Sequence, residues 1–311
     1  MVNLLILDQF AEKYRRALEP KFPEVFIHAA KSKEEIGDFV EKMDVLLAFR
    51  FPDELMKKAT RLQWIQSMAT GVDYITNLPS LRKEILITST RGMHGPQMSE
   101  MAFLHMLNLT RNYPRMLRNQ DRRVWERWPQ PLLSGKTVGI LGIGVIAEEL
   151  ARKCKAFKMK VYGISKTARE VEGIDRFYSR EELPRVAAEI DYLIVLVPYS
   201  PETHKIVNAK VLSAMKPTAY LINIARGQVI DEEALIEALK NRKIAGAGLD
   251  VFNEEPLPKD HPFWGMENVI VSPHVAGMSN IYAEQLLPIF EENLRRFLKG
   301  ERRNLINRVE W

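Results

Sequence analysis

Three ionisable residues stand at turns that follow predicted strands in the second half of the chain. Arg226 lies just past the apolar run 220–224, His274 lies just past the run 269–271, and Glu255 lies between them. A hydride reduces a carbonyl when the developing alkoxide is stabilised and protonated, and a 2-keto acid also needs its carboxylate held in place. Doubly wound sheets bind ligands at the carboxyl ends of their strands. These three side chains are therefore candidates for such a site.

A glycine-rich turn at residues 136–147 is typical of a dinucleotide site. An apolar run predicts a strand before the turn, and helical spacing of apolar residues follows it. Gly142 permits the tight turn, Gly144 lets the backbone approach a pyrophosphate, and Ala147 allows close packing of helix on strand. The helix N-terminus offers unpaired N–H groups to the phosphates. The alternative is an ordinary glycine turn between a strand and a helix.

The loop after the second strand of this unit bears on the choice of cofactor. In NAD-binding folds an acidic residue about 20 positions after the glycine turn binds the ribose hydroxyls. Here Ser165, Lys166, Thr167 and Arg169 follow the strand 161–164, and no acid is present. A 2′-phosphate could accept hydrogen bonds from the hydroxyls and pair with the cations. We therefore expect NADP(H) to be favoured over NAD(H), the alternative being a solvated loop with NAD bound through other contacts.

The elements that must position these residues alternate along the chain. Short apolar runs separated by helical patterns indicate α/β architecture with parallel sheets. The glycine turn falls mid-sequence, so a separate α/β region precedes it. The runs are 4–7, 45–48, 85–87, 138–141, 161–164, 193–197, 220–224 and 269–271.

Two long helical patterns predict where the chain crosses between domains. One helix, with Pro96 in its first turn, is predicted from Gln97 to about Arg118 with a kink at Pro114, and another covers 281–298. The alternative is one continuous domain. We predict two Rossmann-like domains, with a doubly wound dinucleotide-binding domain (99–278) inserted into a substrate-binding domain (1–98 and 279–311).

Composition restricts the partners. The chain has 311 residues, 46% of them hydrophobic, which suffices for two cores. Its single cysteine, Cys154, excludes an internal disulfide and supplies no metal cluster, so we expect no metal. The net charge of +5 comes from basic residues mixed with acidic ones, which favours solvated helix faces over a nucleic-acid surface. With no basic leader and no long apolar run, we expect no membrane partner and a cytoplasmic location.

The order of the motifs resembles a known family. Residues 66–73 (Gln-Ser-Met-Ala-Thr-Gly-Val-Asp), the glycine turn and residues 272–277 (Ser-Pro-His-Val-Ala-Gly) are similar to motifs of the D-isomer-specific 2-hydroxyacid dehydrogenases. The resemblance covers nearly the whole chain and implies a flavodoxin-like substrate domain. It also implies that main-chain N–H groups of Thr70 and Gly71 hold the substrate carboxylate.

The resemblance assigns roles to the three ionisable residues. It implies that Arg226 binds the substrate carboxylate and carbonyl, that His274 donates the proton, and that Glu255, in preference to Glu254, pairs with the histidine. Each has a plainer alternative: a surface arginine, a capping or core histidine, and a solvated glutamate. Arg50, after the strand 45–48, is a candidate second cation for the substrate or one half of a surface ion pair.

Further residues are assigned to the cofactor. In the family a basic residue often follows the second glycine, and here it is Val145, so the hold on the pyrophosphate rests on backbone groups. By resemblance Asp250 lies close to the nicotinamide, although a turn-forming aspartate is nearly as good an interpretation. The predicted cofactor contacts are Gly142, Gly144, Val145, Ile146, Ser165, Lys166, Thr167, Arg169, Val197, Pro198, Thr203, Ala225 and Asp250.

The remaining residues of note concern assembly and the other histidines. Trp125 and Trp128 resemble the paired tryptophans of glyoxylate/hydroxypyruvate reductases, which implies a homodimer, while ordinary interface or core packing is the alternative. Together with the basic cofactor loop, the pair makes glyoxylate and hydroxypyruvate the expected substrates, with pyruvate and branched 2-keto acids as the alternatives. His94 is expected to be structural, and His105, in mid-helix, is a weak catalytic candidate. The competing function is a dinucleotide-sensing, corepressor-like interaction protein without turnover.

Overall fold

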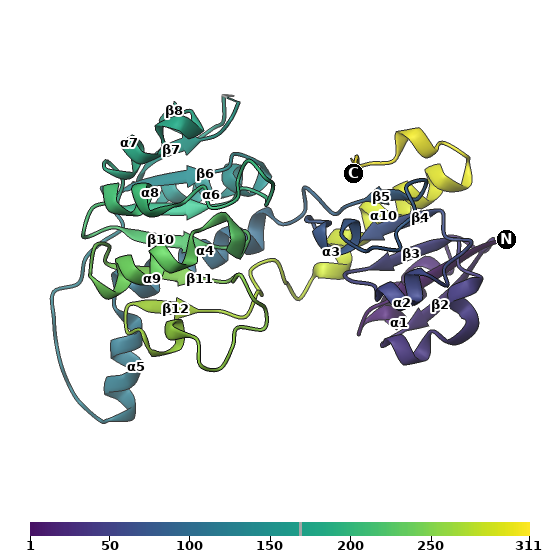
Figure 1. Cartoon of the computed structure of the whole chain (residues 1–311), viewed down its shortest axis with the longest axis horizontal. Helices are drawn as coiled ribbons and strands as arrows, with labels where there is room; N and C mark the ends of the chain where they lie inside the picture. Colours follow the sequence, from purple (N-terminus) through teal and green to yellow (C-terminus); the bar gives the residue numbers. More distant parts are fainter. Residues whose placement is uncertain (168–169) are drawn as a thin grey trace. The chain divides into compact units, whose positions relative to one another are not determined.

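The computed structural model describes residues 1–167 and 170–311, and the chain forms two compact units (Figure 1). The first unit consists of residues 1–93 and 279–311, and the second unit of residues 94–278. Each unit has its own sheet and its own hydrophobic clusters on both faces of that sheet. The predicted α/β class with mostly parallel sheets is confirmed.

The first unit is built on a six-stranded sheet in the order β13-β5-β4-β3-β1-β2. All neighbouring strands are parallel except β13, which is antiparallel to β5. The strands are β1 (Val2–Leu7), β2 (Val25–Ala30), β3 (Val45–Ala48), β4 (Trp64–Ser67), β5 (Leu86–Thr88) and β13 (Arg308–Val309), and the α-helices are α1 (Ala11–Leu18), α2 (Asp53–Met56), α3 (Asp73–Thr76) and α10 (Tyr282–Leu298). Short 3₁₀ turns lie at Lys33–Glu35, Gly37–Glu41 and Arg302–Asn304.

The second unit is built on a parallel sheet of seven strands in the order β12-β11-β10-β9-β6-β7-β8. The chain order reverses between β6 and β9, which is the switch point where such sheets bind ligands. The strands are β6 (Thr137–Leu141), β7 (Lys160–Ile164), β8 (Arg176–Tyr178), β9 (Tyr192–Val195), β10 (Tyr220–Asn223), β11 (Gly246–Leu249) and β12 (Val269–Val271). The α-helices are α4 (Gly95–Thr110), α5 (Tyr113–Asp121), α6 (Val145–Ala156), α7 (Leu183–Ala187), α8 (Ala209–Ala214) and α9 (Glu232–Lys240), and 3₁₀ turns lie at Arg180–Glu182, Gly227–Val229 and Pro262–Gly265.

Helices cover both faces of the second sheet. One hydrophobic cluster joins α4 and α6 to the strands, and another joins α7, α8 and α9 to them. Because both faces are buried, the central strands β6, β9 and β10 are largely apolar, as is usual in parallel sheets. Among the described residues, no helix combines the length and apolarity needed to cross a bilayer.

The helix predicted from residue 97 to about 118 is wrong in one respect, because it is two helices. Helix α4 ends at Thr110, Asn112 adopts a left-handed conformation (φ 50°), and α5 begins at Tyr113. Pro114 lacks an N–H and its ring would clash with the carbonyl four residues earlier, so the break occurs before it. The placement of Pro96 in the first turn of α4 and the helix over 281–298 are confirmed.

Candidate active site

The glycine turn between β6 and α6 has room for a ligand on one side only. Gly142 has φ 101°, and a Cβ there would lie 2.7 Å from the backbone nitrogen of Val197. Gly144 is the N-cap of α6 without a side-chain cap, and a Cβ there would meet no described atom within 4 Å. The N–H groups of the first turn of α6 are therefore accessible to an anion, as a pyrophosphate site requires. Val145 is exposed and adds no charge.

The basic loop after β7 is paired with an acid from the loop that follows β9. Lys166 Nζ lies 2.9 Å from Glu202 Oε1, and Arg180 Nη1 lies 3.8 Å from Glu202 Oε2. The hydrogen bond from Lys166 holds the pKa of Glu202 below its usual value, and Arg180 adds to this. Ser165 Oγ donates to the Thr167 carbonyl. Sequence reasoning did not find Glu202, which follows β9 and meets the loop only in the folded chain. Arg169, also predicted to bind the cofactor, lies outside the described residues.

The loop after β9 is closed by its own side chains. Thr203 is buried, and its Oγ1 donates to the Pro198 carbonyl at 2.7 Å and accepts from the Ser200 N–H at 2.8 Å. Val197 is fully buried beside Gly142. Both buried side chains therefore shape the loop, and Pro198 is exposed beside them.

Arg226 stands on a turn that packs directly against the segment carrying Glu255. A Cβ at Gly227 would lie 2.0 Å from the carbonyl carbon of Phe252, so that position requires glycine. Arg226 Nη1 donates to the Ala225 carbonyl at 2.7 Å, while the Ala225 N–H donates to the side chain of Asn223. The close backbone approach fixes the arginine turn beside the acidic segment.

His274 and Glu255 form a direct pair. His274 Nδ1 lies 2.7 Å from Glu255 Oε2, and Glu255 Oε1 accepts the Phe252 N–H at 3.1 Å. Burial acts to raise the pKa of Glu255, but the hydrogen bonds from His274 and Phe252, with the charge of Arg226, outweigh it, so the pKa lies below 4.5. Glu254 is exposed. The acid in contact with the histidine is therefore Glu255.

Asp250 holds the backbone of the loop that carries His274. Its carboxylate is fully buried and accepts hydrogen bonds from Ser272 Oγ (2.6 Å), the Val275 N–H (3.0 Å) and the Ala276 N–H (2.9 Å). The His274 N–H donates to the Asp250 carbonyl at 2.8 Å. Burial raises the pKa of Asp250, although these hydrogen bonds oppose it. The clamp supports His274 at a φ of 53°, a conformation unfavourable for a residue with a Cβ.

The candidate residues of the first unit follow two neighbouring parallel strands. Thr70 and Gly71 come after β4, and Arg50 comes after β3. Carboxyl ends of adjacent parallel strands meet at one edge of a sheet, so these groups belong to the same edge. The Arg50 guanidinium lies 4.0 Å from the ring centre of Tyr74, a cation–π contact.

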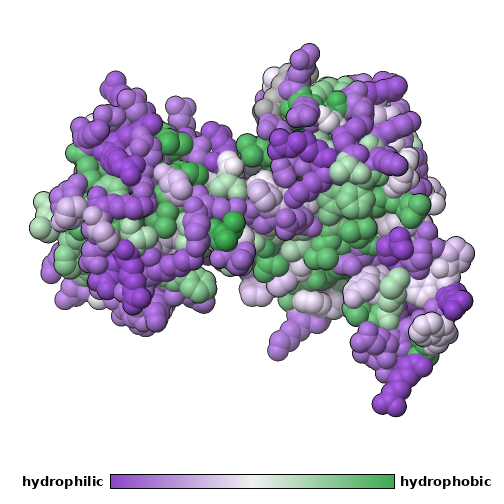
Figure 2. All heavy atoms as spheres, turned by 180° about the vertical axis from the view of Figure 1, so that it is seen from behind, coloured by the Kyte–Doolittle hydropathy of each residue, from purple (hydrophilic) through white to green (hydrophobic). Residues whose placement is uncertain are grey.

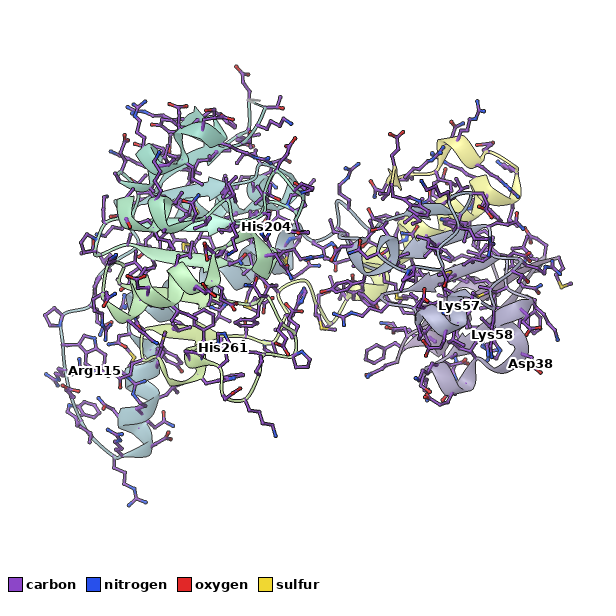
Figure 3. The ribbon with its side chains drawn as sticks, in the orientation of Figure 1. Asp38, Lys57, Lys58, Arg115, His204 and His261 are labelled. Atoms are coloured by element: carbon purple, nitrogen blue, oxygen red, sulfur yellow. The ribbon has the colours of Figure 1, made fainter. Side chains whose placement is uncertain are left out.

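The other histidines lie in different environments. His204 and His261, labelled in Figure 3, occupy separate loops of the second unit, and His261 Nε2 lies 3.5 Å from Glu232. His94 and His105 are buried, and burial lowers the pKa of each to about 4. Over residues 1–167 and 170–311 there is no cluster of His, Cys, Asp or Glu that could hold a metal ion.

The second unit therefore has the features of a nicotinamide-dependent oxidoreductase: an open dinucleotide turn and an acid–histidine pair on loops that follow strands of one parallel sheet. Residues 103–276 match the family model described as D-isomer specific 2-hydroxyacid dehydrogenase, NAD binding domain. The chain belongs to this family, which confirms the predicted resemblance and an oxidoreductase acting on CH–OH donors.

Two curated relatives cover much of the chain. D-3-phosphoglycerate dehydrogenase of Methanocaldococcus jannaschii is 32% identical over 99% of this chain, which spans 60% of that protein's length. Glyoxylate reductase of Pyrococcus furiosus is 34% identical over 87% of this chain and 83% of its own length.

Solved structures match both units. A family member from Aeromonas salmonicida has a TM-score of 0.91 at 34% identity, with 99% of each chain covered. The NADPH-dependent glyoxylate/hydroxypyruvate reductase of Sinorhizobium meliloti, in complex with NADP and sulfate, has a TM-score of 0.86 at 27% identity, covering 100% of this chain and 98% of that one.

Proposed function

We propose that the protein reduces a small 2-keto acid, glyoxylate or hydroxypyruvate, to the D-2-hydroxy acid with His274 as proton donor. The observation that carries this proposal is the 2.7 Å pair of His274 and Glu255, with Arg226 on the adjoining turn. One of the two curated relatives supports this substrate class, since the 34% identical protein is a glyoxylate reductase, whereas the 32% identical protein is a D-3-phosphoglycerate dehydrogenase.

Different residues of the second unit bind the cofactor, donate the proton and orient the substrate. The backbone at Gly144 and the N-terminus of α6 hold the pyrophosphate of the dinucleotide, which supplies a hydride when bound. Glu255 fixes His274 through Nδ1, which leaves Nε2 to donate a proton to the developing alkoxide, and its carboxylate stabilises the charged imidazole. Arg226 holds the substrate carboxylate and carbonyl in two-point contact.

We assign the remaining substrate contacts to the first unit. Main-chain N–H groups of Thr70 and Gly71 are proposed to bind the substrate carboxylate, and Arg50 to add a second cation. Support comes from their common position after the adjacent strands β3 and β4. Arg50→Gln is expected to raise the KM for the keto acid more than it lowers kcat, whereas an unchanged KM would remove Arg50 from the site.

The first experiment is a panel of 2-keto acids assayed with NADPH, together with oxidation of 3-phosphoglycerate. We expect glyoxylate or hydroxypyruvate to have the highest kcat/KM. His274→Ala should lower kcat by about 10²–10⁴-fold with little change in NADPH binding. Near-normal turnover by this variant would overturn the mechanism. NADPH binding without turnover of any substrate would favour the competing function, a dinucleotide sensor.

For the cofactor, we propose that NADPH is preferred. Support comes from the hydroxyls of Ser165 and Thr167 and the cation of Lys166 where an acid would bind NAD, and from the NADP complex of the Sinorhizobium relative. Lys166→Gln should lower the ratio of kcat/KM for NADPH to that for NADH about tenfold, the loss of roughly 1.4 kcal/mol of binding. Lys210→Gln, an exposed lysine on α8, is the control. A wild-type enzyme that uses NADH equally well would refute the preference.

For assembly, we propose a homodimer through α5 and the segment after it. Leu117, Val124 and Trp125 are 45%, 51% and 88% exposed, and Arg115, labelled in Figure 3, lies over the ring of Trp128 at 4.5 Å. Figure 2, which views the molecule from behind, shows apolar surface on the second unit, to which α5 belongs. Aromatic anchors of this kind favour an interface. Trp125→Ser with Leu117→Glu should convert a dimer to a monomer in analytical ultracentrifugation, and a monomeric wild type would refute the proposal.

We also propose a cytoplasmic location. The chain's single cysteine, Cys154, is buried and free, which suits a compartment where disulfides do not form. Separation of cell fractions with an antibody tests this, and recovery outside the cytoplasm would contradict it.

A further inference from the structure

A buried chain of hydrogen bonds runs from α4 to the loop that carries His274. His105, on α4, is 1% exposed, and its Nε2 lies 3.2 Å from Ser272 Oγ. Ser272 Oγ donates in turn to Asp250 Oδ1 at 2.6 Å. The histidine is packed tightly on β11, because a Cβ at Gly248 would lie 2.7 Å from its ring. The three side chains therefore link a helix to the ends of two neighbouring strands.

The chemistry of the acceptors determines which group donates each hydrogen bond. An ionised carboxylate only accepts, so the Ser272 hydroxyl gives its proton to Asp250 and offers its lone pairs to His105. His105 must then donate through Nε2–H, and a neutral imidazole carries only one N–H. The other ring nitrogen, Nδ1, is buried without a hydrogen-bond partner in the described part of the chain. Burial also lowers the pKa of His105, which keeps the ring neutral.

This series of hydrogen bonds ends at the backbone beside His274. The oxygen of Asp250 that receives the Ser272 proton, Oδ1, also accepts the Val275 N–H, and Oδ2 accepts the Ala276 N–H. An apolar side chain would fill the place of His105 without an unpartnered nitrogen. We therefore attribute the histidine to a polar interaction, and the polar contact described for it is the one with Ser272.

We propose that His105 is a positioning residue for the proton donor: its Nε2–H sets the Ser272 hydroxyl on Asp250, and Asp250 holds residues 274–276 in the conformation that aims the His274 ring. This inference rests on the proposed role of His274. His105 acts through two intermediates and takes no part in proton transfer.

The test is a double-mutant cycle between His105 and Ser272. His105→Phe keeps a ring against Gly248 but removes the donor, and we expect kcat to fall up to about tenfold, the equivalent of one hydrogen bond, with an unchanged KM for NADPH. His105→Gln places an amide N–H near the position of Nε2 and should restore most of kcat. The double variant with Ser272→Ala should be no slower than Ser272→Ala alone. Additive effects, or a loss that appears only in KM, would overturn the proposal.

Two further readouts need no turnover. Long-range ¹H–¹⁵N spectra at pH 7 should show His105 as the Nε2–H tautomer, and the Nδ1–H tautomer would overturn the proposal. Amide exchange at Val275 and Ala276 should be faster in His105→Phe than in wild type, whereas unchanged exchange would refute the link. If the wild type reduces no keto acid, the proposed function fails, and these two measurements still decide the link. If His105→Phe does not fold, comparison of His105→Gln with His105→Asn replaces it, because asparagine reaches only the position of Nδ1.

Discussion

Two glycines of the same turn should respond to alanine in opposite ways. At Gly142, alanine must adopt a φ of 101° and place its Cβ 2.7 Å from the Val197 nitrogen and 2.9 Å from the Leu196 carbonyl carbon. At Gly144 the backbone is extended (φ −132°, ψ −164°), and the described residues leave the Cβ position open. Gly142→Ala is therefore a change to the fold, and Gly144→Ala is a change to the surface that faces the pyrophosphate.

The magnitudes follow from these two geometries. For Gly142→Ala, the strained backbone costs about 1–3 kcal/mol and the overlap with backbone atoms about 1–3 kcal/mol more. For a unit of this size that total lowers the Tm by roughly 5–20 °C. Gly144→Ala should change the Tm little, because alanine restricts the unfolded chain by about 0.4–1 kcal/mol but caps the N-terminus of α6 less well than glycine by a similar amount. Its methyl group would separate the backbone from the pyrophosphate, and we expect NADPH binding to weaken at least about tenfold, or 1.4 kcal/mol.

The assay pairs thermal unfolding with a fluorescence titration of NADPH. The expected result is a low Tm for Gly142→Ala, and a wild-type Tm with weak NADPH binding for Gly144→Ala. Gly265, which also has no described atom within 4 Å of its Cβ position, supplies the control variant Gly265→Ala, with binding unchanged. If Gly144→Ala bound NADPH as tightly as the wild type, the pyrophosphate would not lie at this turn, and the open Cβ position would not mark a ligand site.

Four other predictions concern the site and the core. Glu255→Gln should lower kcat about 10²-fold or more, because the charged imidazole loses its partner, while Glu254→Gln stays near wild type. The pKa of Glu255 lies below 4.5, so its contribution to stability is present above pH 4.5 and is lost as the pH falls through the folded-state value; denaturant unfolding should show the wild type and Glu255→Gln converging in acid. Gly227→Ala, whose Cβ would lie 2.0 Å from the Phe252 carbonyl carbon, should reduce soluble expression and Tm more than any other glycine variant of the site. Burial lowers the pKa of His105 from 6.5 to about 4, so through this residue unfolding should become easier from pH 6.5 to 4 by up to about 3 kcal/mol; His105→Phe should lose correspondingly less stability than the wild type, because the buried His94 contributes equally to both.

The sequence predicted most reliably what depends on short spacing. The turn at Gly142 and Gly144 and the Pro-His motif at His274 are local patterns, since a backbone requirement or a motif is complete within a few residues. The break at Asn112 was missed because a proline in a helical pattern allows either a kink or a stop. Strand β11 was not among the predicted apolar runs because two of its residues are glycines, and the close approach of His105 to Gly248 explains one of them.

Contacts between distant segments could not be predicted in this way. Glu202 meets Lys166 although 36 positions separate them, and His105 meets Ser272 across 167 positions. On sequence alone, a histidine in the middle of an apolar helix is indistinguishable from a core residue. Only the fold shows which polar group lies opposite it.

The ends of the second unit have a consequence for how such chains arise and can be rebuilt. Gln97 Nε2 lies 3.3 Å from the Gly277 carbonyl, so the first and last turns of this unit are adjacent. In the first unit, Gln285 Nε2 lies 3.4 Å from the Met93 carbonyl, so the chain also leaves and re-enters that unit at neighbouring points. A segment whose two ends lie close together can be inserted into another domain, or removed from it, at one surface position without disturbing that domain's sheet. We therefore expect residues 94–278 to fold when excised as one segment, and residues 93 and 279 to be joinable by a short linker without loss of the first sheet.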